Sequence, residues 1–276
     1  MPGSARLADL VDAYDGLLID VYGVLKDASG ALPGAADLIA HLRAIAKPFA
    51  LVTNDASRLP ATVARGLAGL GIAVDADRIV TSGSLIAPHF AAAGLAGARC
   101  LVLGTADSHA YVTQAGGALA PLDGRAEIDA VVVCDDAGFD FLPGIEAALS
   151  AAVRALDAGR ELALVLPNPD LVYPKGGGQL GFTAGAIALL IESALRRRYP
   201  DRAVAFAALG KPRRPMFDEA RRRLGGGRLV MLGDQLETDI AGALAAGIDA
   251  ALIAGVSRWT PAAAVEPTWI VDDLAL

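Results

Sequence analysis

Four segments of this chain place acids, hydroxyls or a lysine where an apolar run or a turn ends. The first is LLIDVYGVLKD (residues 17–27), in which an apolar run ends at Asp20 and a glycine-containing loop follows. A continuous apolar run predicts a buried parallel strand, and open α/β sheets bind ligands at the carboxyl ends of such strands. Asp20 is therefore a candidate for chemistry, with capping of the following turn as the structural alternative.

The second and third segments are VTND (52–55) and GKP (210–212). Thr53 and Asn54 follow an apolar run, where they either contact a ligand or cap the next helix. Lys211 lies in a Gly-Lys-Pro turn just before a predicted helix. A lysine held there supplies a fixed positive charge beside helix N–H groups that favour an anion, although a lone lysine is usually solvated.

In the fourth segment, LGDQLETDIAGALAAG (232–247), two acids lie close together after a strand. Asp234 ends the strand, and Asp239 follows five residues later in the first turn of the next helix. Two carboxylates held this close are costly unless a cation lies between them. The pair therefore indicates a cationic partner.

Strands and helices alternate along the chain and must position these side chains. The strands are apolar throughout, which predicts an α/β fold with a parallel sheet covered on both faces. From residue 83 to about 181 further strands predict a second compact unit, and PKGGGQLG (174–181) is interpreted as a hinge. The expected helices are 7–13, 35–46, 59–70, 106–115, 144–158, 182–198, 213–224 and 238–246.

Composition excludes some partners. The 276 residues carry a net charge of -7, so there is no basic stripe for nucleic acid, and the 54% hydrophobic content supplies ample core. Cys100 and Cys134 lie in apolar strands and are expected to be buried thiols. No apolar run approaches the ~18 residues of a membrane span, and the N-terminus lacks a secretory pattern, so we expect a cytoplasmic protein.

In their order and spacing, DVYGV, VTN, GKP and GDQLETDIAGA resemble the four motifs of the haloacid dehalogenase (HAD) superfamily of aspartate-nucleophile hydrolases. The NPD of LPNPDLVYP and the helix TAGAIALLIESA resemble subclass IIA, which includes 4-nitrophenylphosphatase-like enzymes. The resemblance implies a Rossmann-like core from residues 1–82 and 183–276. It also implies an inserted α/β cap of the C2 type from residues 83–182, which would determine substrate specificity.

The resemblance implies roles for the phosphoryl-transfer residues. Asp20 would be the nucleophile that forms an aspartyl-phosphate with a small phosphorylated substrate. Thr53 would hold phosphate oxygens, and Asn54 would orient the adjacent loop. Lys211 would neutralise the transferring phosphoryl group.

The implied cofactor is Mg²⁺, bound by Asp20, Asp234, Asp239 and the backbone carbonyl of Tyr22. Tyr22 stands where phosphatases of the superfamily carry a second aspartate that acts as general acid and base. A phenol with a pKa near ~10 is a poor base at neutral pH, and acid–base catalysis is worth about 10²- to 10⁴-fold. The sequence therefore predicts slow turnover or a restriction to good leaving groups, such as aryl or acyl phosphates.

Two other functions stay open at this stage: binding of a phosphate ester without turnover, and metal-independent dehalogenation of 2-haloacids, whose enzymes also carry Asp-x-Tyr-Gly. Asp55 is either a displaced acid–base group or a cap of the helix near Pro60. Asn168 and Asp170, in the NPD turn, either have a structural role in a hinge or contact the substrate. A homodimer through the cap is also open, and the substrate is not specified.

Overall fold

The computed structural model describes residues 1–253 and 259–276, and its contacts divide the chain into two units. Unit 1 comprises Met1–Thr53, Pro60–Val80 and Lys211–Leu276. Unit 2 comprises Asn54–Leu59 and Thr81–Gly210. The chain therefore passes between the units four times: after Thr53, after Leu59, after Val80 and after Gly210.

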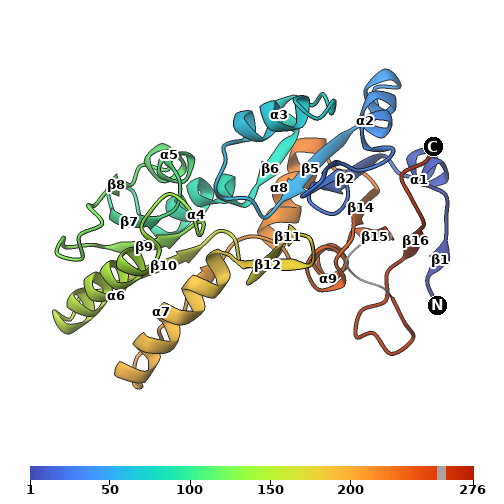
Figure 1. Ribbon diagram of the computed structural model, residues 1–276. Coiled ribbons are helices and arrows are strands. Elements are labelled where there is room, and N and C mark those ends of the chain that lie inside the picture. The colour runs from blue at the N-terminus through green and yellow to red at the C-terminus, as the bar shows by residue number, and fades with distance from the viewer. Residues whose placement is uncertain (254–258) are drawn as a thin grey trace. The chain divides into compact units, whose positions relative to one another are not determined.

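Unit 1 is built on a seven-stranded sheet (Figure 1) in the order β1-β16-β15-β14-β2-β5-β6. The pairings from β1 to β5 are all parallel. Its central strands are buried on both faces, which explains their continuous apolar sequence. The strands are β1 Gly3–Ser4, β2 Gly16–Asp20, β5 Phe49–Thr53, β6 Ile79–Thr81, β14 Leu229–Gly233, β15 Asp249–Ile253 and β16 Trp269–Val271.

The helices of unit 1 bury their apolar residues against this sheet. Leu17 and Ile19 of β2 share one buried cluster with Leu38 and Leu42 of the helix that follows it. A short hairpin, β3 (Lys26–Asp27) with β4 (Gly30–Ala31), follows the Asp20 strand. The helices are α1 Leu7–Ala13, α2 Ala35–Ala44, α3 Pro60–Ala68, α8 Arg214–Leu224 and α9 Ala241–Ala245, with a 3₁₀ turn at Ala76–Arg78 and a π-helical turn at Leu236–Ile240.

Unit 2 has its own five-stranded parallel sheet in the order β13-β10-β9-β7-β8. Its strands are β7 Arg99–Leu103, β8 Ala118–Leu119, β9 Ala130–Val133, β10 Ala163–Leu166 and β13 Ala207–Ala208. Its helices are α4 Ile86–Ala93, α5 Ala106–Gln114, α6 Phe141–Asp157 and α7 Ala184–Arg198, with a 3₁₀ turn at Ser82–Leu85. Cys100 and Cys134 are free and buried in this unit, as expected.

The α/β class and the parallel sheet are confirmed, and the chain contains a second α/β unit, but the hinge predicted at residues 174–181 is wrong. This segment lies within unit 2 and forms an antiparallel hairpin of β11 (Val172–Gly176) and β12 (Gln179–Phe182). Gly176, Gly177 and Gly178 all adopt positive φ, which glycine does without steric cost. The glycine run therefore makes a tight turn and not a linker.

The expected return to the first unit at residue 183 also differs from the observed division. Helix α7 buries Ile187, Ile191 and Leu195 in the same cluster as strands β7, β9 and β10. Burial of this apolar face places residues 183–210 with unit 2.

In the described residues no helix is both long and apolar enough to cross a membrane.

Candidate active site

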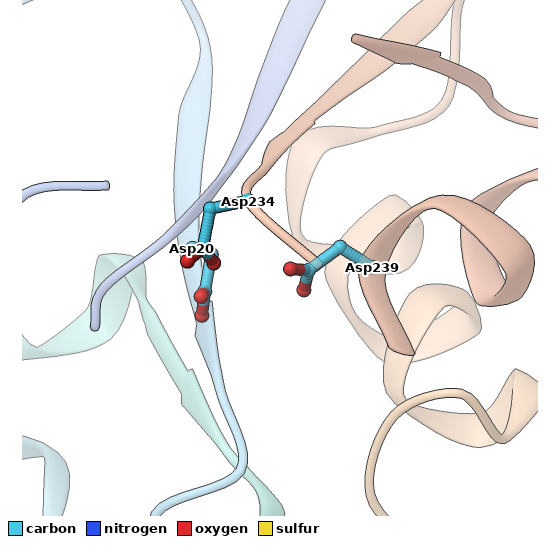
Figure 2. Close-up of side chains that lie close together, drawn as sticks. All are labelled: Asp20, Asp234 and Asp239. Atoms are coloured by element: carbon cyan, nitrogen blue, oxygen red, sulfur yellow. The ribbon is translucent and has the colours of Figure 1, made fainter. Parts of the chain in front are cut away.

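Three buried carboxylates from unit 1 converge at the carboxyl edge of its sheet. Asp20 is the last residue of β2, Asp234 follows the last residue of β14, and Asp239 lies in the π-helical turn. One oxygen from each lies within 4.8 Å of the others. Figure 2 shows the three side chains directed into one small space. This set is the candidate site for a hard cation.

Strand order explains why Asp20 and Asp234 meet. Strands β2 and β14 are parallel neighbours, with Ile19 paired to Leu232, so their carboxyl ends lie at the same edge. The π-helical turn then brings the chain back, and the Gln235 N–H donates to Asp239 Oδ2 at 3.2 Å. Asp234 and Asp239, five residues apart in the sequence, thus both lie at the carboxyl end of β14, beside the end of β2 that carries Asp20.

Two glycines make room for these acids. A Cβ on Gly233 would lie 2.2 Å from the Cβ of Asp239. A Cβ on Gly23, which has a φ of 97°, would lie 2.1 Å from Asp234 Oδ2. Only glycine combines this close approach with that backbone conformation. The loop after Asp20 therefore passes directly against the carboxylate of Asp234.

Lys211 is the cation within this cluster. Its Nζ donates hydrogen bonds to Asp20 Oδ1 and Asp239 Oδ1, each at 2.6 Å, and its side chain is only 4% exposed. Three carboxylates and one ammonium leave two negative charges in excess when all are ionised. Uncompensated buried charge is costly, so this donor set suits a bound divalent cation.

Burial and charge shift the ionisation of the pair. Burial raises the pKa of Asp20 well above its usual range, and the carboxylates of Asp239 and Asp234 raise it further, against the lowering effect of Lys211. Burial alone lowers the pKa of Lys211, but the charges of Asp20 and Asp239 outweigh it and raise the pKa above its ordinary value. Lys211 is therefore a permanent cation, and an added cation near Asp20 would favour its carboxylate form.

Thr53 and Tyr22 lie at the same edge of unit 1. Thr53 ends β5, whose Val52 pairs with Asp20, and the threonine is buried. Tyr22 is half-buried in the loop between Asp20 and Gly23, and its ring lies 5.4 Å from Lys26 Nζ. Sequence reasoning missed Lys26, although it belongs to the same DVYGVLKD segment.

Asn54 and Asp55 belong to unit 2, unlike Thr53 before them. Asp55 Oδ1 accepts hydrogen bonds from the Ser57 N–H and hydroxyl, both at 2.8 Å, and Asp55 Oδ2 accepts one from Arg58 Nε at 2.7 Å. These contacts are those of a turn cap before α3, the structural alternative for Asp55. An acid–base role for Asp55 stays a prediction.

Unit 2 contains an acid that sequence reasoning overlooked. Asp135 follows strand β9, and burial, together with the charges of Asp136 and Asp55, raises its pKa to about 7. The sequence signal was present, because AVVVCDD is an apolar run that ends in acids, as LLID is. Among the described residues of unit 2, Asp135 is the acid whose pKa is raised to near neutrality.

Comparisons with known proteins agree with this geometry. A model of haloacid dehalogenase-like hydrolases matches residues 17–118, and a HAD-hydrolase-like model matches residues 208–276. D-glycerol 3-phosphate phosphatase of Mycobacterium tuberculosis is 31% identical over 97% of this chain and 72% of its own length. The two family models include the residues placed at this sheet edge: Asp20, Tyr22, Thr53, Lys211, Asp234 and Asp239.

Two solved structures resemble the whole chain. A possible sugar phosphatase of the HAD superfamily from Cytophaga hutchinsonii has a TM-score of 0.83 and 28% identity, over 100% of this chain and 99% of its own. A glycerol phosphate phosphatase from Mycobacterium tuberculosis, in complex with calcium, has a TM-score of 0.78 and 30% identity, over 96% of this chain and 75% of its own. Both likenesses extend through units 1 and 2.

Proposed function

Because this chain belongs to the haloacid dehalogenase-like hydrolases, class IIA, and is a phosphatase of that superfamily, we propose that it is a Mg²⁺-dependent phosphohydrolase. We propose that its reaction passes through an aspartyl-phosphate on Asp20. Its substrate is a small phosphorylated metabolite. The observation that carries the proposal is the buried cluster of Asp20, Asp234, Asp239 and Lys211.

The donor set fits the proposed metal. Asp20, Asp234 and Asp239 offer hard oxygen ligands, and the backbone carbonyl of Tyr22 lies in the loop beside them. The close approach of Gly23 to Asp234 supports this assignment, because a side chain at position 23 would fill the space against the carboxylate. When bound, the divalent cation neutralises charge on the phosphoryl group and keeps Asp20 ionised.

The chain's own residues carry the two transfer steps. In the first, an Asp20 oxygen attacks phosphorus while the bond from phosphorus to the leaving oxygen breaks. In the second, water attacks the same phosphorus, releases inorganic phosphate and restores the carboxylate. The Thr53 hydroxyl donates to a phosphoryl oxygen, and Lys211 balances the negative charge of the phosphoryl group in both steps.

Tyr22 distinguishes this enzyme from superfamily phosphatases that carry aspartate there. A protonated phenol can donate a proton to a leaving oxygen, but with an ordinary pKa of ~10 it is a poor base toward water. We therefore propose that turnover is slow for alkyl phosphates and faster for esters whose leaving groups depart unprotonated. Glycerol phosphate, which appears in the names of several relatives, belongs to the alkyl class and is the natural small metabolite to compare.

The carboxylate cluster also argues against the two alternatives. A metal-independent dehalogenase has no use for three buried carboxylates around one lysine, and a site that only binds phosphate esters has no need of a nucleophile hydrogen-bonded to Lys211. Neither alternative is favoured by a specific observation on the described residues.

The test is phosphate release from 4-nitrophenyl phosphate, glycerol 3-phosphate and other sugar phosphates, with and without Mg²⁺. We expect metal-dependent release that Asp20→Asn abolishes, and a phosphoryl group trapped on the wild-type chain after acid quench. Chloride release from 2-chloropropionate without metal would instead support a dehalogenase. Tight phosphate-ester binding without turnover of any substrate would support a binding protein.

A further inference from the structure

A turn at residues 167–170 follows strand β10 in unit 2. Asn54 and Gly210 both contact this turn. Asn54 is 6% exposed, and its Nδ2 donates a hydrogen bond to Asp170 Oδ1 at 2.9 Å. The Gly210 N–H donates to the carbonyl oxygen of Pro167, also at 2.9 Å. A Cβ on Gly210 would lie 2.5 Å from Asn54 Oδ1, so the Asn54 amide packs directly against the backbone of Gly210.

Neighbouring backbone groups hold Asp170 in place. The Asp170 N–H donates to Asn168 Oδ1 at 3.0 Å, and the Gly185 N–H, in the first turn of α7, donates to the Asp170 carbonyl oxygen at 3.0 Å. A Cβ on Gly185 would lie 2.3 Å from the carbonyl oxygen of Pro169, so the helix start lies tightly on the turn. The acceptor of the Asn54 hydrogen bond is therefore fixed within unit 2.

Asn54 and Gly210 are the chain neighbours of two active-site residues. Thr53 precedes Asn54, and Lys211 follows Gly210. Consecutive Cα atoms are about 3.8 Å apart across a trans peptide bond. The contact between Asn54 and Gly210 therefore limits how far apart the backbones of Thr53 and Lys211 can lie.

We propose that Asn54 and Asp170 are positioning residues that set the separation of the Thr53 hydroxyl and the Lys211 ammonium. This inference rests on the proposed function, in which these two groups bind one phosphoryl group. A hydrogen bond to a carboxylate is stronger than one between neutral groups, so the pair resists displacement of Asn54. Misplacement of a catalytic group by about 1 Å can cost roughly 10²-fold in rate.

A purely structural role for the pair would give a different result. Loss of a partly buried hydrogen bond in unit 2 would then lower the melting temperature and leave the rate of the folded enzyme unchanged. Tyr199→Phe is a control that removes a side-chain hydrogen bond elsewhere in unit 2. The Tyr199 hydroxyl shares its hydrogen between two acceptors, Asp157 Oδ1 at 2.6 Å and the Val153 carbonyl oxygen at 3.1 Å. These contacts join the end of α7 to α6 at a different place in unit 2.

The experiment measures kcat, KM and melting temperature for Asn54→Ala, Asp170→Ala, the double variant, and the exchange Asn54→Asp with Asp170→Asn. The substrate is 4-nitrophenyl phosphate with Mg²⁺. We expect each single variant to lose about 10- to 100-fold in kcat with little change in KM. The double variant should lose no more than the more impaired single variant, because both remove the same interaction. The exchange places the acceptor at 54 and the donor at 170 and should recover part of kcat.

Tyr199→Phe should lower the melting temperature and keep kcat. If Asn54→Ala and Asp170→Ala behave like Tyr199→Phe, the positioning role is wrong and the proposed function stands. An exchange variant that is no more active than the single variants would also overturn the positioning role of Asn54 and Asp170. Retention of activity by Asp20→Asn would instead remove the proposed function, and this inference with it.

Discussion

Lys211 Nζ lies 2.6 Å from Asp20 Oδ1 and equally close to Asp239 Oδ1, with all three side chains buried. Asp20 and Lys211 are separated by 191 positions in the chain, and tertiary structure alone brings them together. The pair joins the proposed nucleophile to Lys211, the cation that the described residues place within the carboxylate cluster. Its removal should therefore affect both stability and catalysis.

Lys211→Met is expected to abolish measurable phosphatase activity and to destabilise the metal-free protein. Methionine is unbranched and only one atom shorter than lysine, but it leaves the carboxylates of Asp20 and Asp239 without their ammonium partner. Breaking a buried ion pair by removing one partner costs about 3–5 kcal/mol. Urea unfolding monitored by circular dichroism measures this cost, and Lys175→Met, in the hairpin of unit 2, is the matched control. Wild-type stability in Lys211→Met would contradict the ion-pair argument.

Tyr22→Asp is expected to raise kcat for glycerol 3-phosphate by about 10²- to 10⁴-fold, because aspartate can act as both acid and base. The gain for 4-nitrophenyl phosphate should be smaller, since its leaving group departs with little need of a proton. The measurement is kcat across esters of graded leaving-group pKa. Tyr22→Phe is the control that removes only the phenol hydroxyl, and an equal gain for all esters would show that proton transfer is not what Tyr22 limits.

Chelation of metal should abolish turnover and lower the melting temperature. Divalent cation bound to the folded state stabilises it by mass action, so added Mg²⁺ should raise the melting temperature in a concentration-dependent way. Asp234→Asn should lose this shift, because it removes a proposed ligand from the cluster. Thermal unfolding by fluorescence tests this without any activity assay. A Mg²⁺-dependent shift of wild-type size in Asp234→Asn would exclude Asp234 as a ligand.

Asp135 should make stability fall as pH rises. Burial, and then the charges of Asp136 and Asp55, raise its pKa to about 7 in the folded protein, above the ~3.9 of an unfolded chain. Between these values the folded state binds more protons than the unfolded state, so the free energy of unfolding decreases with pH. The contribution is fully present below about pH 4 and is lost as pH passes through about 7.

Asp135→Asn is the variant that isolates this effect. It keeps the shape of the side chain and removes the titration. We expect its free energy of unfolding, measured by urea at pH 5 to 8, to fall less with pH than that of the wild type, and to be the higher of the two at pH 8. Parallel curves for the two proteins would mean that Asp135 is not the titrating group.

Much of the site follows from the sequence for a physical reason. Asp20, Thr53 and Asp234 end or follow apolar strands, and carboxyl ends of parallel neighbours must meet at one edge of a sheet. The interpretation of residues 174–181 failed because three glycines serve a tight turn as well as a flexible linker. Local composition does not distinguish the two, since the difference lies in whether the flanking residues pair.

The sequence by itself determined the residue types at the site, the α/β class and the presence of a second unit, because apolar periodicity and strand-end acids are local properties of the chain. Tertiary structure alone decided that Lys211 bridges Asp20 and Asp239, that Gly23 lies against Asp234, and that Asn54 reaches Asp170. It also placed α7 with unit 2. These relationships join residues far apart in the chain, and they depend on packing that no local pattern encodes.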